Sequence, residues 1–183
     1  MVSYRNDVGS GALWVDVVSN ILANVPKENL IDLMCHRAPH TPMLGFENIT
    51  FVDIQNRGLD FPLRDSDLFI EQDVIKFLEN QQPSRLTAKE FTRYTTIICS
   101  DGIEHLSKRD GLYLLALIQQ KSKSSVIFTP YGDYMVDENS THPDTHKSGW
   151  TEKNFEKMGF SCIIFPNFHP ELNKGAIFAY KIN

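Results

Sequence analysis

Short apolar runs rich in β-branched residues alternate along this chain with segments of helical periodicity. The strand-like runs are NLIDLM, ITFVDI, DLFIEQD, YTTIICSD, SSVIFTP, SCIIFP and AIFAYKI. Helical spacing is found over residues 14–22, 73–81, 87–94, 106–120 and 151–160. Strands that alternate with helices form right-handed crossovers and a parallel sheet covered on both faces. The pattern therefore predicts an α/β fold with seven strands, in a single domain that spans residues 1–183.

The end of the chain breaks this alternation. The last two strand-like runs, 161–166 and 176–182, are joined by the loop NFHPELNKG, and no helical segment separates them. Strands joined without a crossover helix pair in an antiparallel manner. We therefore expect a mostly parallel sheet whose last strand is antiparallel.

The composition argues against some classes of binding partner, namely nucleic acids and membranes. The net charge is -5 at pH 7 and no block of Lys and Arg is present, which argues against nucleic acid as a partner. No apolar run approaches the roughly 20 residues of a membrane span, and the N-terminal stretch is polar, unlike a signal peptide. The three cysteines, Cys35, Cys99 and Cys162, are far apart and are expected to be reduced, mostly buried thiols. We therefore expect a soluble, cytoplasmic protein with no membrane partner; the sequence does not predict its oligomeric state.

Acidic residues recur at the carboxyl ends of the predicted strands, where ligands bind in an open parallel sheet. Asp32, Asp53 and Asp73 end the first three strands, and Asp101 follows the fourth. An acid at the end of the second strand, about 20 residues beyond the first turn, is typical of a group that binds ribose hydroxyls. The alternative for each of these residues is a helix N-cap, and the sequence leaves both interpretations open.

Several motifs together resemble the class I S-adenosylmethionine-dependent methyltransferases, from about residue 29 to the end of the chain. The motifs are SDGIEHLSKRDG after the fourth strand, VIFTPYG at the fifth, and HKSGWTEKNFEKMGF before the sixth. The resemblance implies a Rossmann-like methyltransferase fold whose antiparallel last strand, near 176–181, is inserted beside the fifth. It also implies S-adenosyl-L-methionine as cofactor, bound by Asp32, Asp53, Ile54, Asp73, Val74 and Ser100.

The loop after the first strand departs from the family pattern. The segment DLMCHRAPHTP contains no glycine, whereas the family places glycines at the positions of Met34, His36 and Ala38. Glycine at such positions allows a positive φ and a close approach to the ligand. The resemblance therefore implies a cofactor loop formed by side chains, with Met34, Cys35, His36 and Arg37 as contacts. Arg37 is the candidate partner for the methionine carboxylate of the cofactor.

Three residues are candidates for catalysis: His146 as a base in a loop over the pocket, and His105 with Asp101 beside the cofactor. No metal site is expected, because the spacing of histidines and cysteines lacks the paired ligands of a zinc site.

The predicted function is methyl transfer to an oxygen or nitrogen of a small-molecule or carried acceptor. The main alternative is a methyltransferase fold without catalysis that serves as a binding or scaffold module, because the loop glycines are missing. A nicotinamide-dependent oxidoreductase is disfavoured by the same missing glycines and by the terminal hairpin.

Overall fold

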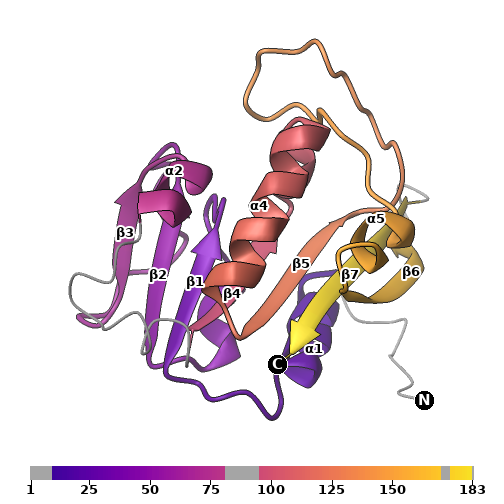
Figure 1. Cartoon of the computed structure of the whole chain (residues 1–183). Coiled ribbons are helices and arrows are strands. Elements are labelled where there is room, and N and C mark those ends of the chain that lie inside the picture. Colours follow the sequence, from indigo (N-terminus) through magenta and orange to yellow (C-terminus); the bar gives the residue numbers. More distant parts are fainter. Residues whose placement is uncertain (1–9, 81–94, 170–173, 183) are drawn as a thin grey trace.

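The computed structural model of the chain describes residues 10–80, 95–169 and 174–182 (Figure 1). Its helices are α1 (Ser10–Ile21), α2 (Val74–Asn80), α4 (Lys108–Lys121) and α5 (Glu152–Glu156), with 3-10 turns η1 (Thr41–Leu44) and η2 (Ile103–His105). Its strands are β1 (Asn29–Leu33), β2 (Asn48–Asp53), β3 (Leu68–Glu71), β4 (Thr95–Ser100), β5 (Ser124–Pro130), β6 (Ser161–His169) and β7 (Lys174–Ile182). The helix predicted over 87–94 lies outside the described residues.

The strands form one seven-stranded sheet in the order β3-β2-β1-β4-β5-β7-β6. The first five strands pair in parallel, and β7 is antiparallel to both of its neighbours. Strand β7 lies between β5 and β6, in a register that sets Phe128 opposite Phe178. The prediction of an antiparallel last strand beside the fifth is therefore confirmed.

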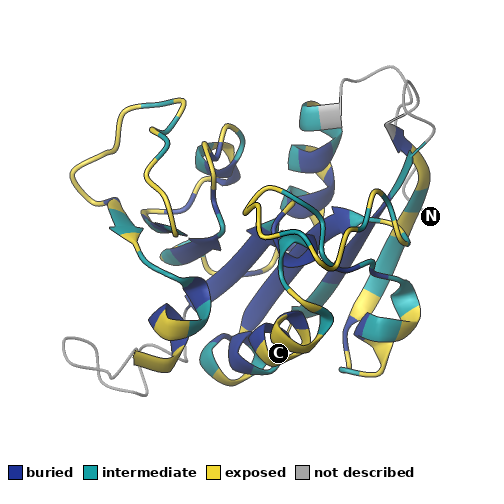
Figure 2. Cartoon of the chain, turned by 90° about the horizontal axis from the view of Figure 1, so that it is seen from above, coloured by how far each residue is buried: buried dark blue, intermediate teal, exposed yellow. Residues whose placement is uncertain are grey.

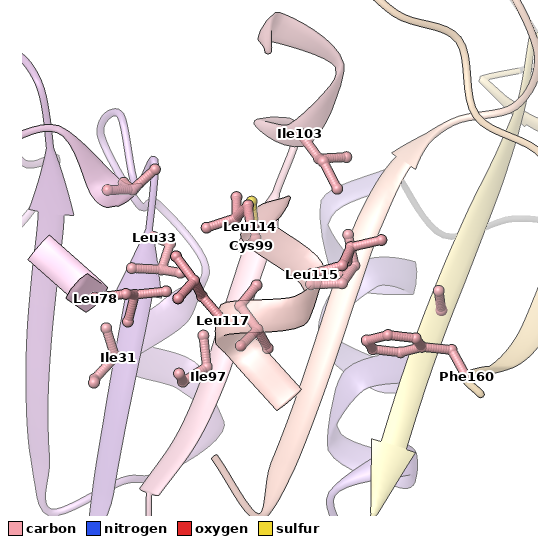
Figure 3. Packing of buried hydrophobic residues seen from close by; sticks show 14 of the residues in the cluster. Ile31, Leu33, Leu78, Ile97, Cys99, Ile103, Leu114, Leu115, Leu117 and Phe160 are labelled. Carbon is pink, nitrogen blue, oxygen red and sulfur yellow. The ribbon is translucent and has the colours of Figure 1, made fainter. Parts of the chain in front are cut away.

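Helices cover both faces of the sheet. On one face, α4 packs Leu114, Leu115 and Leu117 into a cluster that includes Leu33 and Ile97, as Figure 3 shows. On the other face, α1 contributes its buried residues Trp14, Val17 and Val18 to a second cluster, which Leu22, directly after the helix, also joins. Burial of these apolar side chains removes them from water and holds the layers together. Figure 2 shows that buried residues gather in the central strands, while exposed residues lie in the surrounding loops and on parts of the helices.

Two predicted helices have shorter bounds in the structure. The helix expected from residue 106 begins at Lys108, because Ser107 accepts a hydrogen bond from the Asp110 backbone N–H and acts as its N-cap. The helix expected over 151–160 ends at Glu156 and is followed by a turn in which Gly159 has a φ of 79°. Thr151 is its N-cap, as expected, with Asn154 completing a capping box.

The segment between β5 and α5 has no helix of its own. In Figure 1 it rises above the edge of the sheet toward which β1 and β5 point. Its end is fixed by Trp150, which is fully buried and lies against Gly111 of α4; a Cβ at Gly111 would be 2.5 Å from the indole. The glycine in α4 therefore allows this segment to be held above the carboxyl edge of the sheet.

Among the described residues, no helix has both the length and the apolar character needed to cross a membrane. The three cysteines are free thiols; Cys35 and Cys99 are buried and Cys162 is half-buried.

Candidate functional site

A cavity of about 590 Å³ opens at the carboxyl ends of β1, β2, β4 and β5. This is the edge where ligands bind in open α/β sheets. The residues predicted from the sequence that line it are Asp32, Met34, Cys35, His36, Asp53, Ile54, Ser100, Asp101 and His105. Four other predicted residues, Arg37, Asp73, Val74 and His146, do not line it.

The glycine-free loop has the backbone conformation that glycines usually provide. Met34, His36 and Ala38 have φ angles of 56°, 49° and 46°. These are the three positions at which the resemblance placed glycines. A side chain in the left-handed region costs roughly 1–2 kcal/mol per residue, so tertiary contacts must hold the loop in this form. The loop follows a path suited to glycine although it contains none.

One contact of this loop sets the position of Asp53. The backbone N–H of His36 donates to Asp53 Oδ2 at 2.9 Å, and the backbone N–H of Gln55 donates to Oδ1 at 3.1 Å. A carboxylate offers about four lone-pair positions. About two therefore remain on Asp53, which faces the cavity, for donors on a ligand.

Asp32 lies deeper in the same cavity. It is 2% exposed and its Oδ2 accepts a hydrogen bond from Thr41 Oγ1 at 2.6 Å. Burial raises the pKa of Asp32 to about 7, an effect that the Thr41 hydrogen bond opposes and the charge of Asp53 reinforces. Burial likewise raises the pKa of the neighbouring Cys35 thiol, which is therefore neutral at physiological pH.

The arginine that reaches the cavity is Arg57, which the sequence analysis did not identify. Its guanidinium makes a bidentate pair with Asp144, at 3.0 and 2.7 Å, and Nη1 lies 3.3 Å from His36 Nε2. Arg37, in contrast, is exposed and pairs with Asp60 at 3.4 Å. Arg57 and Asp144 thereby link the loop after β2 to the segment between β5 and α5 at the cavity.

Asp73 and Val74 have local structural roles. Asp73 Oδ1 accepts a hydrogen bond from the Lys76 backbone N–H at 2.9 Å, which satisfies a free donor in the first turn of α2. Val74 is 4% exposed and belongs to the core. The sequence left open whether each strand-end acid binds a ligand or caps a helix. The contacts of Asp73 are those of a helix cap.

A cluster of Glu104, His105 and His146 lies beside the cavity, with one potential ligand atom from each residue within 4.8 Å of the others. The Nδ1 atoms of the two histidines lie 3.2 Å from the Thr145 carbonyl and 2.8 Å from the Tyr134 carbonyl. Because a carbonyl can only accept, each Nδ1 carries a proton, and the neutral form of each imidazole has its lone pair on Nε2.

Glu104 completes this cluster from a buried position. It is 2% exposed, and its Oε2 accepts a hydrogen bond from Thr129 Oγ1 at 2.9 Å. Its Oε1 is buried and has no partner among the described residues. Burial raises the pKa of Glu104 to about 8, and the charge of Asp101 adds to this effect. Burial lowers the pKa of His105, so that its imidazole is neutral near pH 7.

These features fit a divalent cation. An unpaired buried carboxylate oxygen and two imidazoles oriented by backbone carbonyls are the arrangement that protein metal sites use. Mixed imidazole and carboxylate ligands suit ions such as Mn²⁺, Co²⁺ or Zn²⁺. No metal was expected from the sequence because its histidines and cysteines lack the paired spacing of a zinc site, and Glu104 was not among the candidate residues. The position of Glu104 directly before His105, in GIEHL, was the available signal.

No model of a known protein family matches the chain, and no curated protein matches it. Solved structures do match. The methyltransferase domain of a bacterial Hen1 protein, CtHen1, is 18% identical, with a TM-score of 0.59 over 93% of this chain and 97% of that one. The small RNA methyltransferase HEN1 is 15% identical, with a TM-score of 0.64 over 98% of this chain and 26% of that one.

A third solved structure is that of 1,6-didemethyltoxoflavin N1-methyltransferase from Burkholderia thailandensis. It is 13% identical, with a TM-score of 0.65 over 97% of this chain and 80% of that one, and it contains S-adenosylhomocysteine. The strand order β3-β2-β1-β4-β5-β7-β6 and the antiparallel β7 of this chain match the fold of these methyltransferases. This chain therefore has the Rossmann-like fold of the class I S-adenosylmethionine-dependent methyltransferases.

Proposed function

We propose that this protein is an S-adenosylmethionine-dependent methyltransferase. The observation that carries the proposal is the pairing of Asp53 with the left-handed loop, through the 2.9 Å hydrogen bond from His36. That contact holds a carboxylate with free lone pairs at the strand end where ribose hydroxyls bind. Similar structures with bound S-adenosylhomocysteine support the same choice of cofactor.

A hydroxyl is the acceptor that best suits the cluster beside the cavity. Transfer to oxygen breaks the bond between the sulfonium and the methyl carbon, forms a carbon–oxygen bond, and releases the hydroxyl proton. A divalent ion bound by Glu104, His105 and His146 would lower the pKa of such a hydroxyl. Without an ion, a free Nε2 of His105 or His146 could accept the proton. A lone pair on Nε2 cannot bind a metal ion and accept a proton at the same time. Whether a metal ion binds therefore decides if the histidines act as ligands or as bases.

The acceptor is a small molecule or a group carried on a larger molecule. One similar fold is that of an O-methyltransferase family protein, 12% identical with a TM-score of 0.56. Two others are the Hen1 proteins, one of them named as a methyltransferase of small RNA. The negative net charge argued against nucleic acid, but these likenesses remove the basis for excluding it.

The alternative is a binding or scaffold module without catalysis. The missing glycines favour it, because glycine at these positions allows the backbone to approach the ligand closely. The left-handed angles at Met34, His36 and Ala38 weaken that argument, because the loop follows a glycine-like path.

Calorimetric titration with S-adenosylhomocysteine tests the proposal. Asp53→Ala should weaken binding by about 2–4 kcal/mol, since each charge-assisted hydrogen bond contributes roughly 1.5–3 kcal/mol before partial compensation. The matched control is Asp65→Ala, which removes an exposed carboxylate outside the cavity. Absence of binding in the wild type would favour the scaffold alternative, and equal affinity in Asp53→Ala would exclude the ribose role.

The metal site has a separate test that does not require activity. Mn²⁺ and Zn²⁺ should raise the melting temperature of the wild type, because an ion that binds only the folded state stabilises it. Glu104→Gln should abolish this increase, whereas Glu47→Gln, at an exposed position, should retain it. Equal increases in both variants would mean that the ions bind elsewhere.

A further inference from the structure

The cavity extends beyond the strands that carry the proposed cofactor residues. Asp53 and Ile54 lie at the end of β2, whereas Phe128 belongs to β5 and Phe168 to β6. In the sheet, β1 and β4 separate β2 from β5. Helix α1 adds Trp14, which shares a hydrophobic cluster with Phe128 and Phe168. The cavity therefore has a second end, which we call the aromatic end and define by Trp14, His40, Phe128 and Phe168.

The aromatic end contains a buried donor without an acceptor. Trp14 lines the cavity and is 5% exposed, and its indole Nε1 has no hydrogen-bond partner among the described residues. A buried unpaired donor costs about 1–3 kcal/mol. A ligand that places a hydrogen-bond acceptor beside the Trp14 N–H would remove this cost.

The other side chains of this end are rings held in place by packing. The His40 ring lies 6.0 Å from that of Trp14 and presses against α1, where a Cβ on Gly11 would be 2.5 Å from its Nε2. Phe128 packs against Phe168 with ring centroids 5.0 Å apart. Rings fixed in this way offer flat apolar surfaces at little cost in side-chain entropy.

The chemistry of this end selects a particular kind of ligand. An aliphatic chain would leave the Trp14 N–H unpaired. The charged methionine end of the cofactor would lose its hydration beside Phe128 and Phe168, which is costly. A flat, neutral ligand ring with a carbonyl or a ring nitrogen suits both the unpaired Trp14 N–H and the aromatic side chains. Its faces contact the aromatic side chains, and its edge accepts the hydrogen bond from Trp14.

We infer that the aromatic end binds a heteroaromatic ring of the methyl acceptor, with Trp14 donating its indole N–H to an acceptor atom on the ring edge. The inference rests on the proposed function, since the ring belongs to the molecule that receives the methyl group. The same ring chemistry is found in a free nucleoside, in the terminal base of an RNA strand and in a small-molecule heterocycle.

The test uses protein saturated with S-adenosylhomocysteine, titrated with uridine, a short oligouridylate and 4-quinolone. At least one probe should bind saturably, and Trp14→Phe should weaken it about three- to tenfold, the range for one lost hydrogen bond. The probe that binds most tightly identifies the source of the ring. For uridine or the oligouridylate, 5,6-dihydrouridine serves as the non-aromatic control and should bind more weakly.

The matched control is Tyr113→Phe, which also removes one side-chain hydrogen bond, from the exposed Tyr113 hydroxyl to Glu79, at a residue that does not line the cavity. It should leave probe affinity unchanged. Because the chain has two tryptophans, Trp150→Phe leaves Trp14 as the single tryptophan, and its fluorescence then reports occupancy of the cavity. If Trp14→Phe fails to fold, quenching of Trp14 in Trp150→Phe and the titration of His40→Ala replace it.

Three results would overturn the inference: no saturable binding of any probe, probe affinity that Trp14→Phe does not change, or an equal loss of S-adenosylhomocysteine affinity in that variant. The last would assign the aromatic end to the cofactor. Each of them leaves the proposed function standing, because that proposal depends on S-adenosylhomocysteine binding by the wild type and on Asp53.

Discussion

Replacing His36 by glycine should stabilise the fold relative to replacing it by alanine. His36 has a φ of 49°, in the region where a Cβ costs roughly 1–2 kcal/mol. Glycine removes that cost but adds about 0.4–1 kcal/mol through the greater freedom of the unfolded chain. The His36→Gly variant should therefore be more stable than His36→Ala by about 1 kcal/mol or slightly less.

The comparison with alanine isolates the energetic cost of the left-handed backbone conformation at residue 36. The His36 side chain is exposed, and both substitutions remove its contact with Arg57 at 3.3 Å. Both also keep the backbone N–H that donates to Asp53. What differs between the two variants is the Cβ, so their difference in unfolding free energy measures the cost of the left-handed conformation.

Urea denaturation at equilibrium, with the slope held common to all variants, gives the free energies. For a chain of this size, 1 kcal/mol corresponds to about 2–4 °C in melting temperature. The matched reference is Ala116→Gly in the middle of α4, where glycine should cost about 1 kcal/mol. If glycine at position 36 were less stable than alanine by a similar amount, the loop would not have the left-handed form, and the argument for a glycine-like cofactor loop would fail.

Three further predictions concern charged groups. Asp32 has a pKa of about 7 in the fold, above its usual 3.8, so the folded state keeps a proton that the unfolded chain loses, and this residue alone should lower stability by up to about 4 kcal/mol between pH 4 and 7. Because burial also raises the pKa of Asp101 and Glu104, Asp32→Asn should make the fall in stability shallower without abolishing it. Arg57 and Asp144 are partly exposed, so a double-mutant cycle on unfolding should give a small favourable coupling that 1 M salt reduces; salt-independent coupling would contradict an ion pair. Arg37→Ala tests the predicted contact with the cofactor carboxylate: a tenfold or greater loss of S-adenosylhomocysteine affinity, with little change for adenosine, supports that contact, whereas unchanged affinity agrees with its place outside the cavity.

The sequence by itself determined the architecture. Each strand of a buried parallel sheet is a short apolar run, and each crossover helix has its own periodicity, so both are local patterns. The absence of a helix between β6 and β7 likewise required their antiparallel pairing. For the same reason Asp32 and Asp53 could be placed at the cavity: a residue at the carboxyl end of a parallel strand lies at one edge of the sheet, whatever follows it.

Tertiary structure decided which side chains share the site. Arg37 and Arg57 both follow strand-end acids, yet only Arg57 lines the cavity, where it contacts Asp144, 87 residues further along the chain. His146 meets Glu104 and His105 because the segment before α5 folds back over the sheet, a path that no local pattern specifies. The left-handed angles at the positions of the missing glycines also depend on contacts between distant residues, because the intrinsic preference of His36 or Ala38 opposes them. Side-chain identity specifies local conformation, whereas the path of a loop depends on everything against which it packs.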